Sequence, residues 1–154
     1  MLKKQITEQL IKAVKNKDKE SINAIRLILA AIKDKEILLR SSEGKNKEIS
    51  EDIIFNVLKN MIKQRNESIE LYKEGNRPEL VDKENKEIEV IKKFLPEQLD
   101  KNSVENICRE IIKNLNAKSI SDMGKVMAEI KKHKSSSQID MANASSYVKI
   151  ILNG

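Results

Sequence analysis

Apolar residues recur along almost the whole chain at intervals of three and four residues, which is the spacing of one face of an α-helix. No segment shows a convincing alternation of apolar and polar residues, the pattern typical of a β-strand. The sequence therefore predicts an all-α fold of about seven helices. We expect four helices at about 2–14, 19–40, 51–74 and 78–94, and three shorter ones that hold the apolar positions of 104–115, 123–130 and 141–152.

Residues with a defined capping chemistry stand at the ends of these helices. Ser50 and Asp140 are expected N-caps, whose side-chain oxygens accept hydrogen bonds from unpaired backbone N–H groups. Gly75 follows the third helix and is expected in the left-handed conformation that ends many helices. Pro78 then opens the fourth helix, where a missing N–H costs nothing. A polar loop is expected at 41–47.

Pro96 marks the best boundary between domains. Proline cannot continue a helix, and it pushes the preceding residue out of helical geometry, so the fourth helix must end before it. We therefore expect an N-terminal helical domain at 1–95, a bundle of about four helices. A small C-terminal domain of three helices is expected at 96–154.

Four charged residues interrupt the apolar stripes of the N-terminal domain. Arg65 lies in the stripe of the third helix, and Glu84 and Glu87 lie in that of the fourth. Arg26 interrupts residues 25–32, which are otherwise apolar nearly all round and so indicate a helix central to the bundle. Because an unpaired charge on a buried face is strongly destabilising, we expect Arg26 or Arg65 to pair with Glu84 or Glu87. The alternative is acid–base catalysis by the two carboxylates, but no nucleophile, histidine or set of metal ligands accompanies them.

Composition narrows the classes of function. Aromatic residues make up 3% of the 154 residues and tryptophan is absent, so the core must be aliphatic. One histidine and a single cysteine, Cys108, exclude an internal disulfide and a Cys/His zinc site, and we expect no metal and no cofactor. No stretch approaches the roughly 20 apolar residues of a membrane span, and no apolar leader is visible. We therefore expect no membrane association and a cytoplasmic location.

The net charge of +6 is spread along the chain. Such an excess attracts polyanions without specifying one, and a solvated surface explains most of it. The pair Gly124-Lys125 resembles half of a phosphate-binding loop, but Ser119 replaces the first glycine of that motif and Val126 replaces its hydroxyl residue. We therefore expect Gly124 to open a helix and to permit the close approach of another backbone.

Six short motifs follow one another along nearly the whole chain. They are the segments 25–33, 63–68 and 75–80, the pair Glu84 and Glu87, and the segments 94–99 and 122–127. In this order they resemble the YqeY proteins, in the GatB/YqeY group. The resemblance implies an all-α N-terminal domain followed by a small three-helix domain. It also implies kinship with the C-terminal part of the B subunit of glutamine-dependent aspartyl/glutamyl-tRNA amidotransferase, in which the related tail contacts tRNA.

By this resemblance, the chain is a tRNA-binding or tRNA-amidotransferase-associated module without its own active site, because it corresponds to the tail and its helical neighbour alone. The contacts expected for tRNA are Lys125, Lys131, Lys132 and Lys134. One departure concerns the turn before the last helix, which is Gly-Arg-Ala-Asp-like in family members and is Ser137-Gln138-Ile139-Asp140 here. The loss of the glycine and the arginine weakens the case for RNA contact at this loop.

Two alternatives stay open. A protein-interaction module would dock on a partner through the Met-containing face of the small domain. A carbon–nitrogen ligase activity with glutamine as amide donor is attached to the family, but no amidase nucleophile, kinase-like site or metal set is visible in the sequence. We therefore expect no catalytic residue in this chain.

Overall fold

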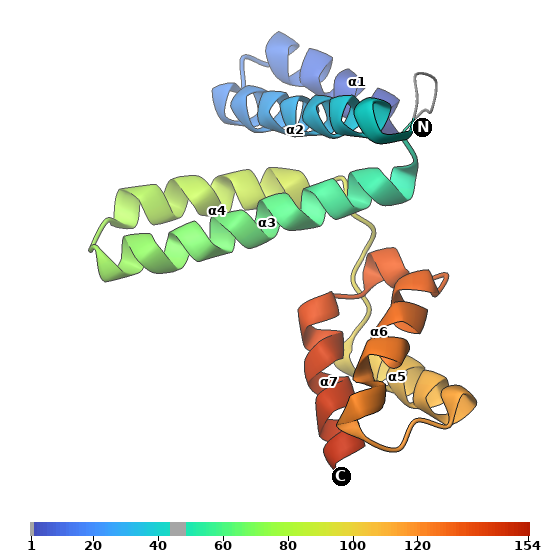
Figure 1. The fold of residues 1–154 in the computed structure, drawn as a ribbon. Helices are drawn as coiled ribbons and strands as arrows, with labels where there is room; N and C mark the ends of the chain where they lie inside the picture. Colours follow the sequence, from blue (N-terminus) through green and yellow to red (C-terminus); the bar gives the residue numbers. More distant parts are fainter. Residues whose placement is uncertain (1, 44–48) are drawn as a thin grey trace. The chain divides into compact units, whose positions relative to one another are not determined.

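The computed structural model describes residues 2–43 and 49–154, and every regular element in these ranges is a helix (Figure 1). The prediction of an all-α fold is therefore confirmed for the described residues. The chain divides into two compact units at the Leu95–Pro96 bond, one over Met1–Leu95 and one over Pro96–Gly154. Each unit has a hydrophobic core of its own.

The first unit holds α1 (Leu2–Lys15), α2 (Lys19–Glu43), α3 (Glu51–Glu74) and α4 (Pro78–Lys92). These helices form two antiparallel pairs, because α1 packs beside α2 and α3 packs beside α4 (Figure 1). The two pairs are joined mainly by α2, which lies against α3 and α4. The core between the pairs is aliphatic, and its fully buried side chains are Ile6, Ile28, Ile32, Ile54, Leu58 and Ile91.

Most helix ends lie where the sequence predicts them. The N-cap prediction for Ser50 is confirmed, since its hydroxyl accepts a hydrogen bond from the N–H of Ile53 at 3.3 Å. The largest difference is at the end of α2, which continues to Glu43 and so includes the first residues of the expected loop at 41–47. Residues 44–47 of that loop lie outside the described residues.

The turn between α3 and α4 corrects the prediction for Gly75. This glycine has a φ of −80°, whereas the next residue, Asn76, has the left-handed φ of 55°. The N–H of Arg77 donates to the carbonyl of Tyr72 at 2.8 Å, and that of Asn76 donates to the carbonyl of Lys73 at 3.1 Å. These two bonds define a Schellman motif with Asn76 as its left-handed residue. Asparagine tolerates this conformation better than most other residues, so it replaces glycine here.

The second unit holds α5 (Lys101–Leu115), α6 (Met123–Lys132) and α7 (Met141–Asn153), which pack on one another. The short 3-10 helices η1 (Ile120–Asp122) and η2 (Ser136–Gln138) precede α6 and α7. Asp140 is the N-cap of α7, as predicted, and its carboxylate accepts hydrogen bonds from two backbone N–H groups of the first turn. The core side chains with the least exposure are Cys108, Val126, Ile130, Ile139, Ala144 and Val148.

A short clasp joins the start of this unit to the loop before α7. The N–H of Leu99 donates to the carbonyl of Gln138 at 2.8 Å. The side-chain amide of Gln98 donates to the carbonyl of Ser137 at 3.2 Å, and the amide of Gln138 donates in return to the carbonyl of Glu97 at 3.1 Å. The loop that departs from the family's usual turn therefore has a structural role in fastening residues 97–99.

Candidate functional site

A half-buried charge cluster lies between α3 and α4, and we call Arg65, Glu84 and Glu87 the Arg65 cluster. The Nε of Arg65 donates to Glu87 at 2.9 Å, and its Nη1 donates to the carbonyl of Met61 at 3.1 Å. Glu84 lies farther from the guanidinium, with 4.0 Å between the nearest charged atoms. The three side chains are only 13–17% exposed. One cation thus faces two carboxylates in a site that water reaches poorly.

The Arg65 cluster has two carboxylates and one cation, and its environment raises the pKa of Glu84. Burial raises the pKa of Glu84 above its ordinary value, and the neighbouring carboxylate of Glu87 raises it further. Arg65 and Lys83 lower this pKa, but by less. Folding therefore favours the protonated form of Glu84. Of the two carboxylates in the Arg65 cluster, Glu84 has the weaker contact with Arg65.

We expect Glu84→Gln to stabilise the protein at neutral pH. The folded-state pKa of Glu84 is raised, so its contribution is fully present below the ordinary value of 4.5 and is lost as the pH rises through the folded-state pKa. Glutamine keeps the shape of the side chain and carries no charge at any pH. Thermal unfolding of both proteins should show a higher melting temperature for the variant at pH 7, and a smaller difference at pH 4. A lower melting temperature at pH 7 would contradict the assignment.

Arg26, the fourth charged residue predicted for this cluster, does not take part in it. Its side chain is exposed on the outer side of α2, and it has no hydrogen bond or ion pair within the described ranges. The prediction named Arg26 or Arg65 as the cation, and the structure pairs Arg65 with Glu87. The sequence did not decide between the two arginines, because the segment around Arg26 is apolar nearly all round and its periodicity does not reveal which side faces the core. Its neighbour Leu27 is also 45% exposed, so this side of α2 faces away from the core, although α2 packs against α1, α3 and α4 as expected for a central helix.

The four lysines predicted to contact tRNA lie on α6 and directly after it. Lys125, Lys131 and Lys132 are on the helix, Lys134 follows its end, and all four are exposed. Lys125 and Lys132 lie on one side of α6, because seven residues make nearly two helical turns. Lys131 lies about 100° around the helix from Lys132. The structure therefore gives a basic helix and loop rather than four cations converging on one point.

Few carboxylates offset these lysines. Glu129 lies 3.7 Å from Lys132, an exposed pair that is worth little in water. Three other acidic side chains of the second unit, Asp100, Asp122 and Asp140, accept hydrogen bonds from backbone N–H groups at the starts of helices. Asp122 also interacts electrostatically with Lys125, whereas Lys131 and Lys134 have no carboxylate within ion-pair distance among the described residues.

The turn before η1, which leads into α6, is closed by a carboxylate of the chain itself. The carboxylate of Asp122 accepts hydrogen bonds from the N–H groups of Lys118 and Ser119, and these bonds lower its pKa. An anion of the protein itself therefore already occupies this turn. The predicted close approach at Gly124 is also wrong, because a Cβ added there would meet no atom within 4 Å. Gly124 lies at an exposed position in the first turn of α6.

This correction predicts that Gly124→Ala stabilises the second unit. Alanine costs less backbone entropy than glycine in a helix, and the added methyl group meets no neighbour, so the gain should be about 0.5–1 kcal/mol. Chemical denaturation followed by circular dichroism measures the change. If Gly124→Ala destabilised the protein, a contact that needs glycine would have to exist.

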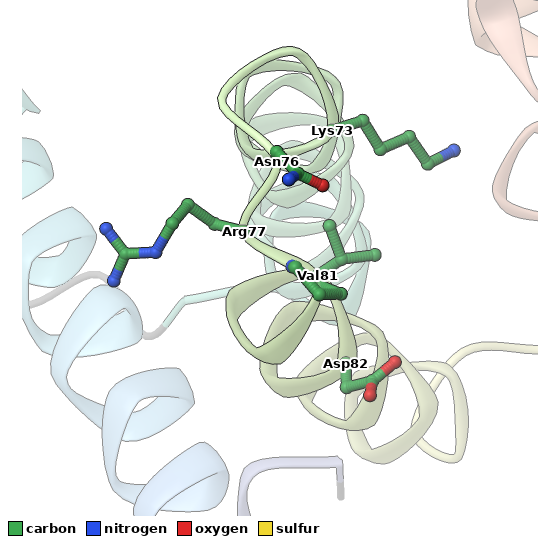
Figure 2. Close-up of a pocket in the computed structure, with 6 residues that line it drawn as sticks. Lys73, Asn76, Arg77, Val81 and Asp82 are labelled. Carbon is green, nitrogen blue, oxygen red and sulfur yellow. The ribbon is translucent and has the colours of Figure 1, made fainter.

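Two hollows lie on the surface of the first unit. A hollow of about 240 Å³ lies at the turn between α3 and α4. Figure 2 shows that its two cationic side chains, Lys73 and Arg77, extend in opposite directions. Arg77 instead donates to Glu79 at 2.6 Å, which is a local contact of the turn. A second hollow, of about 450 Å³, is lined mainly by polar residues of α1 and of the turn into α2, and on its other side by Val90, Lys93 and Phe94 at the end of α4.

Groups suited to nucleophilic or metal chemistry are equally scattered. Cys108 is 1% exposed, and burial together with Glu105 raises the pKa of its thiol, so the reactive thiolate is disfavoured. His133 accepts a hydrogen bond on Nδ1 from the N–H of Ser135 at 3.1 Å. Within 2–43 and 49–154, no three side chains of the metal-binding types come together. None of the helices in these ranges has the length and apolar character needed to cross a membrane.

Comparison with known proteins identifies related chains in yeast. The chain is 37% identical over 108 residues to the altered inheritance of mitochondria protein 41, mitochondrial, of Saccharomyces cerevisiae, a match covering 70% of this chain and 55% of the relative. It is 36% identical over 90 residues to the protein of the same name from Lachancea thermotolerans, covering 58% of this chain and 46% of the relative. The chain thus spans about half the length of these relatives.

The mitochondrial names of these relatives contradict the expected cytoplasmic location. That expectation rested on the lack of an apolar leader, which argues only against a secretory signal. Transit peptides of mitochondria are amphipathic and basic, so a hydropathy argument does not detect them.

The family to which the chain belongs is shown by a match over almost its full length. A family model described as Yqey-like protein matches residues 3–152. This range includes the six motifs noted in the sequence and both structural units. The chain therefore belongs to the YqeY-like family.

Proposed function

We propose that this chain is a tRNA-binding module, associated with tRNA amidotransferase and without an active site of its own. One observation of the structure supports the proposal above others. Lys125, Lys131 and Lys134 are exposed, and none of them has a carboxylate within ion-pair distance in the described part of the chain. The choice of tRNA as the polyanion rests on the resemblance to the amidotransferase tail, and membership of the YqeY-like family supports that resemblance.

The chemistry of these lysines fits a backbone-directed contact. An ammonium group at the end of a flexible side chain binds phosphate as a point charge and carries no sequence information. Such contacts release counterions, so the affinity falls as the salt concentration rises. The free ammonium groups on α6 and after it thus support binding by charge and shape. Any preference for one tRNA would need further contacts.

Salt dependence gives the sharpest test. We expect the full-length chain to bind total tRNA at low salt, with a logarithmic affinity that falls linearly with the logarithm of salt concentration. Changing Lys125, Lys131 and Lys134 together to glutamine should flatten that slope by about 2–3, which is roughly one for each lost phosphate contact. A matched triple change of Lys4, Lys12 and Lys63, exposed lysines of the first unit, should leave the slope unchanged.

Two outcomes would contradict the proposal. One is an absence of tRNA binding even at low salt. The other is binding whose salt dependence is the same in both triple variants, which would place the contact elsewhere.

A protein-interaction module is the second candidate, and one observation favours it. The second unit exposes three large apolar side chains, Leu115, Ile120 and Ile150, and Ile150 is 69% exposed. The methionines at first considered for docking, Met123 and Met127, instead pack partly buried against the core. Capture of the chain from cells at its native level discriminates the two candidates, because tRNA is recovered in one case and a stoichiometric protein in the other. For a carbon–nitrogen ligase activity, a contact between a hydroxyl and a carboxylate is present in the described ranges, from Ser21 to Asp18 at 2.6 Å, but it is exposed and lies where Asp18 also accepts the N–H of Ser21 at the start of α2.

A further inference from the structure

The outer side of α2 carries an exposed face centred on Ala30. Residues three, four and seven positions from Ala30 lie within about 60° of it around the helix. Leu27 is 45% exposed and Ile37 is 54% exposed. We call this surface the α2 face, and it is formed by Arg26, Leu27, Ala30, Lys33, Asp34 and Ile37, all of them exposed.

Two features distinguish the α2 face from an ordinary solvated surface. A helix that is apolar nearly all round is normally covered on all sides, yet α1, α3 and α4 leave this side uncovered. Arg26 and Asp34 also lack any hydrogen bond or ion pair among the described residues. They lie eight residues apart, about 12 Å along the helix, so they cannot pair with each other.

We propose that the α2 face packs against the same face of a second copy of this chain, with the two helices antiparallel and Ala30 at the two-fold axis. In this arrangement, residues equally distant from Ala30 in opposite directions meet across the interface. Arg26 then lies opposite Asp34 of the second copy, and the symmetry repeats that pair. Arg26 and Asp34, which lack a partner in one chain, thus each obtain one in the dimer.

The remaining residues of the α2 face suit this packing. Ala30 has a small side chain at the crossing point, which lets two helix axes approach within about 8–10 Å. Leu27 lies opposite Lys33 of the second copy, whose aliphatic stem can cover a leucine while its ammonium stays in water. One helix on each side gives an area below that of a standard stable interface, so the association is expected in the micromolar range.

Charge reversal tests this arrangement. Sedimentation velocity of the full chain should show a rising mass between about 5 µM and about 500 µM protein. Arg26→Asp or Asp34→Arg alone places like charges together twice in each dimer, and each should weaken dimerisation at least about tenfold. The double variant carrying both changes restores opposite charges and should dimerise about as well as the original chain.

The control is Lys63→Asp, a change from a positive to a negative charge at an exposed position of α3, which should leave dimerisation unaffected. Because the substituted side chains are exposed in the monomer, melting temperatures in dilute solution should stay unchanged. A chain that stays monomeric at about 500 µM would overturn the proposal and leave the α2 face to another partner. The proposal would also be overturned if the single charge reversals left dimerisation unchanged, or if the double variant did not restore it.

Discussion

Replacing Arg65 by methionine should destabilise the protein by about 2–3 kcal/mol, because it leaves two carboxylates in a half-buried site without a counter-charge. Methionine fills much of the space of the arginine stem, so the loss reports mainly the charge and the hydrogen bonds to Glu87 and to the carbonyl of Met61. Urea unfolding followed by far-ultraviolet circular dichroism measures the effect, since the chain has no tryptophan for fluorescence.

Two variants separate charge from packing in this result. Arg77→Met removes another arginine of the first unit, but its side chain is 59% exposed and should contribute little. Adding Glu84→Gln and Glu87→Gln to Arg65→Met removes the uncompensated charges and should restore part of the loss. A triple variant as unstable as Arg65→Met alone would show that packing of the arginine stem, and not charge balance, explains the destabilisation.

Replacing Leu58 by alanine should cost about 2–5 kcal/mol, which makes it the other large effect. Leu58 is fully buried in α3 at the contact between the two helical pairs, so its removal leaves a cavity in an aliphatic core. The matched control is Leu71→Ala. This leucine is in the same helix but is 66% exposed, and its replacement should change stability by less than about 0.5 kcal/mol.

Because both substitutions change leucine to alanine in one helix, the difference in helix propensity cancels between them. The difference between the two losses of stability therefore measures the effect of burying the leucine side chain. Equal losses for Leu58→Ala and Leu71→Ala would show that the surface around Leu71 is covered in solution.

The helices could be predicted because their ends depend on local chemistry. Ser50 and Asp140 act through hydrogen bonds to N–H groups two or three residues away, and such contacts are visible in the sequence itself. The left-handed residue after α3 was displaced by one position because Gly75 and Asn76 are adjacent and both tolerate that conformation. The error is small, since either assignment ends the helix at the same place.

Side-chain environments were harder to predict because they depend on which elements meet. The stripes of α3 and α4 each contain a charge between apolar neighbours on a single face, and the structure brings Arg65 and Glu87 into contact. Around Arg26 every face is apolar, so no stripe indicates the buried side. The prediction of a close contact at Gly124 was wrong for a related reason. A glycine in a helix allows another backbone to approach closely, but it does not show that such a neighbour is present.

The candidate tRNA surface stays a prediction. The sequence identified lysines on one short helix, and the structure adds that three of them have no carboxylate within ion-pair distance among the described residues. Phosphate contacts require only exposed positive charge, which many unrelated surfaces offer. The specificity of the proposal therefore comes from the family and not from the geometry of α6.

The buried thiol of Cys108 makes the second unit observable on its own. As the chain's one cysteine, in the core of the second unit, it can react with a thiol reagent only when that unit opens. Its labelling rate therefore reports the opening equilibrium of the second unit, while circular dichroism reports both units together. Arg65→Met and Leu58→Ala act in the first unit, so unchanged labelling of Cys108 in these variants would show that the two halves unfold independently.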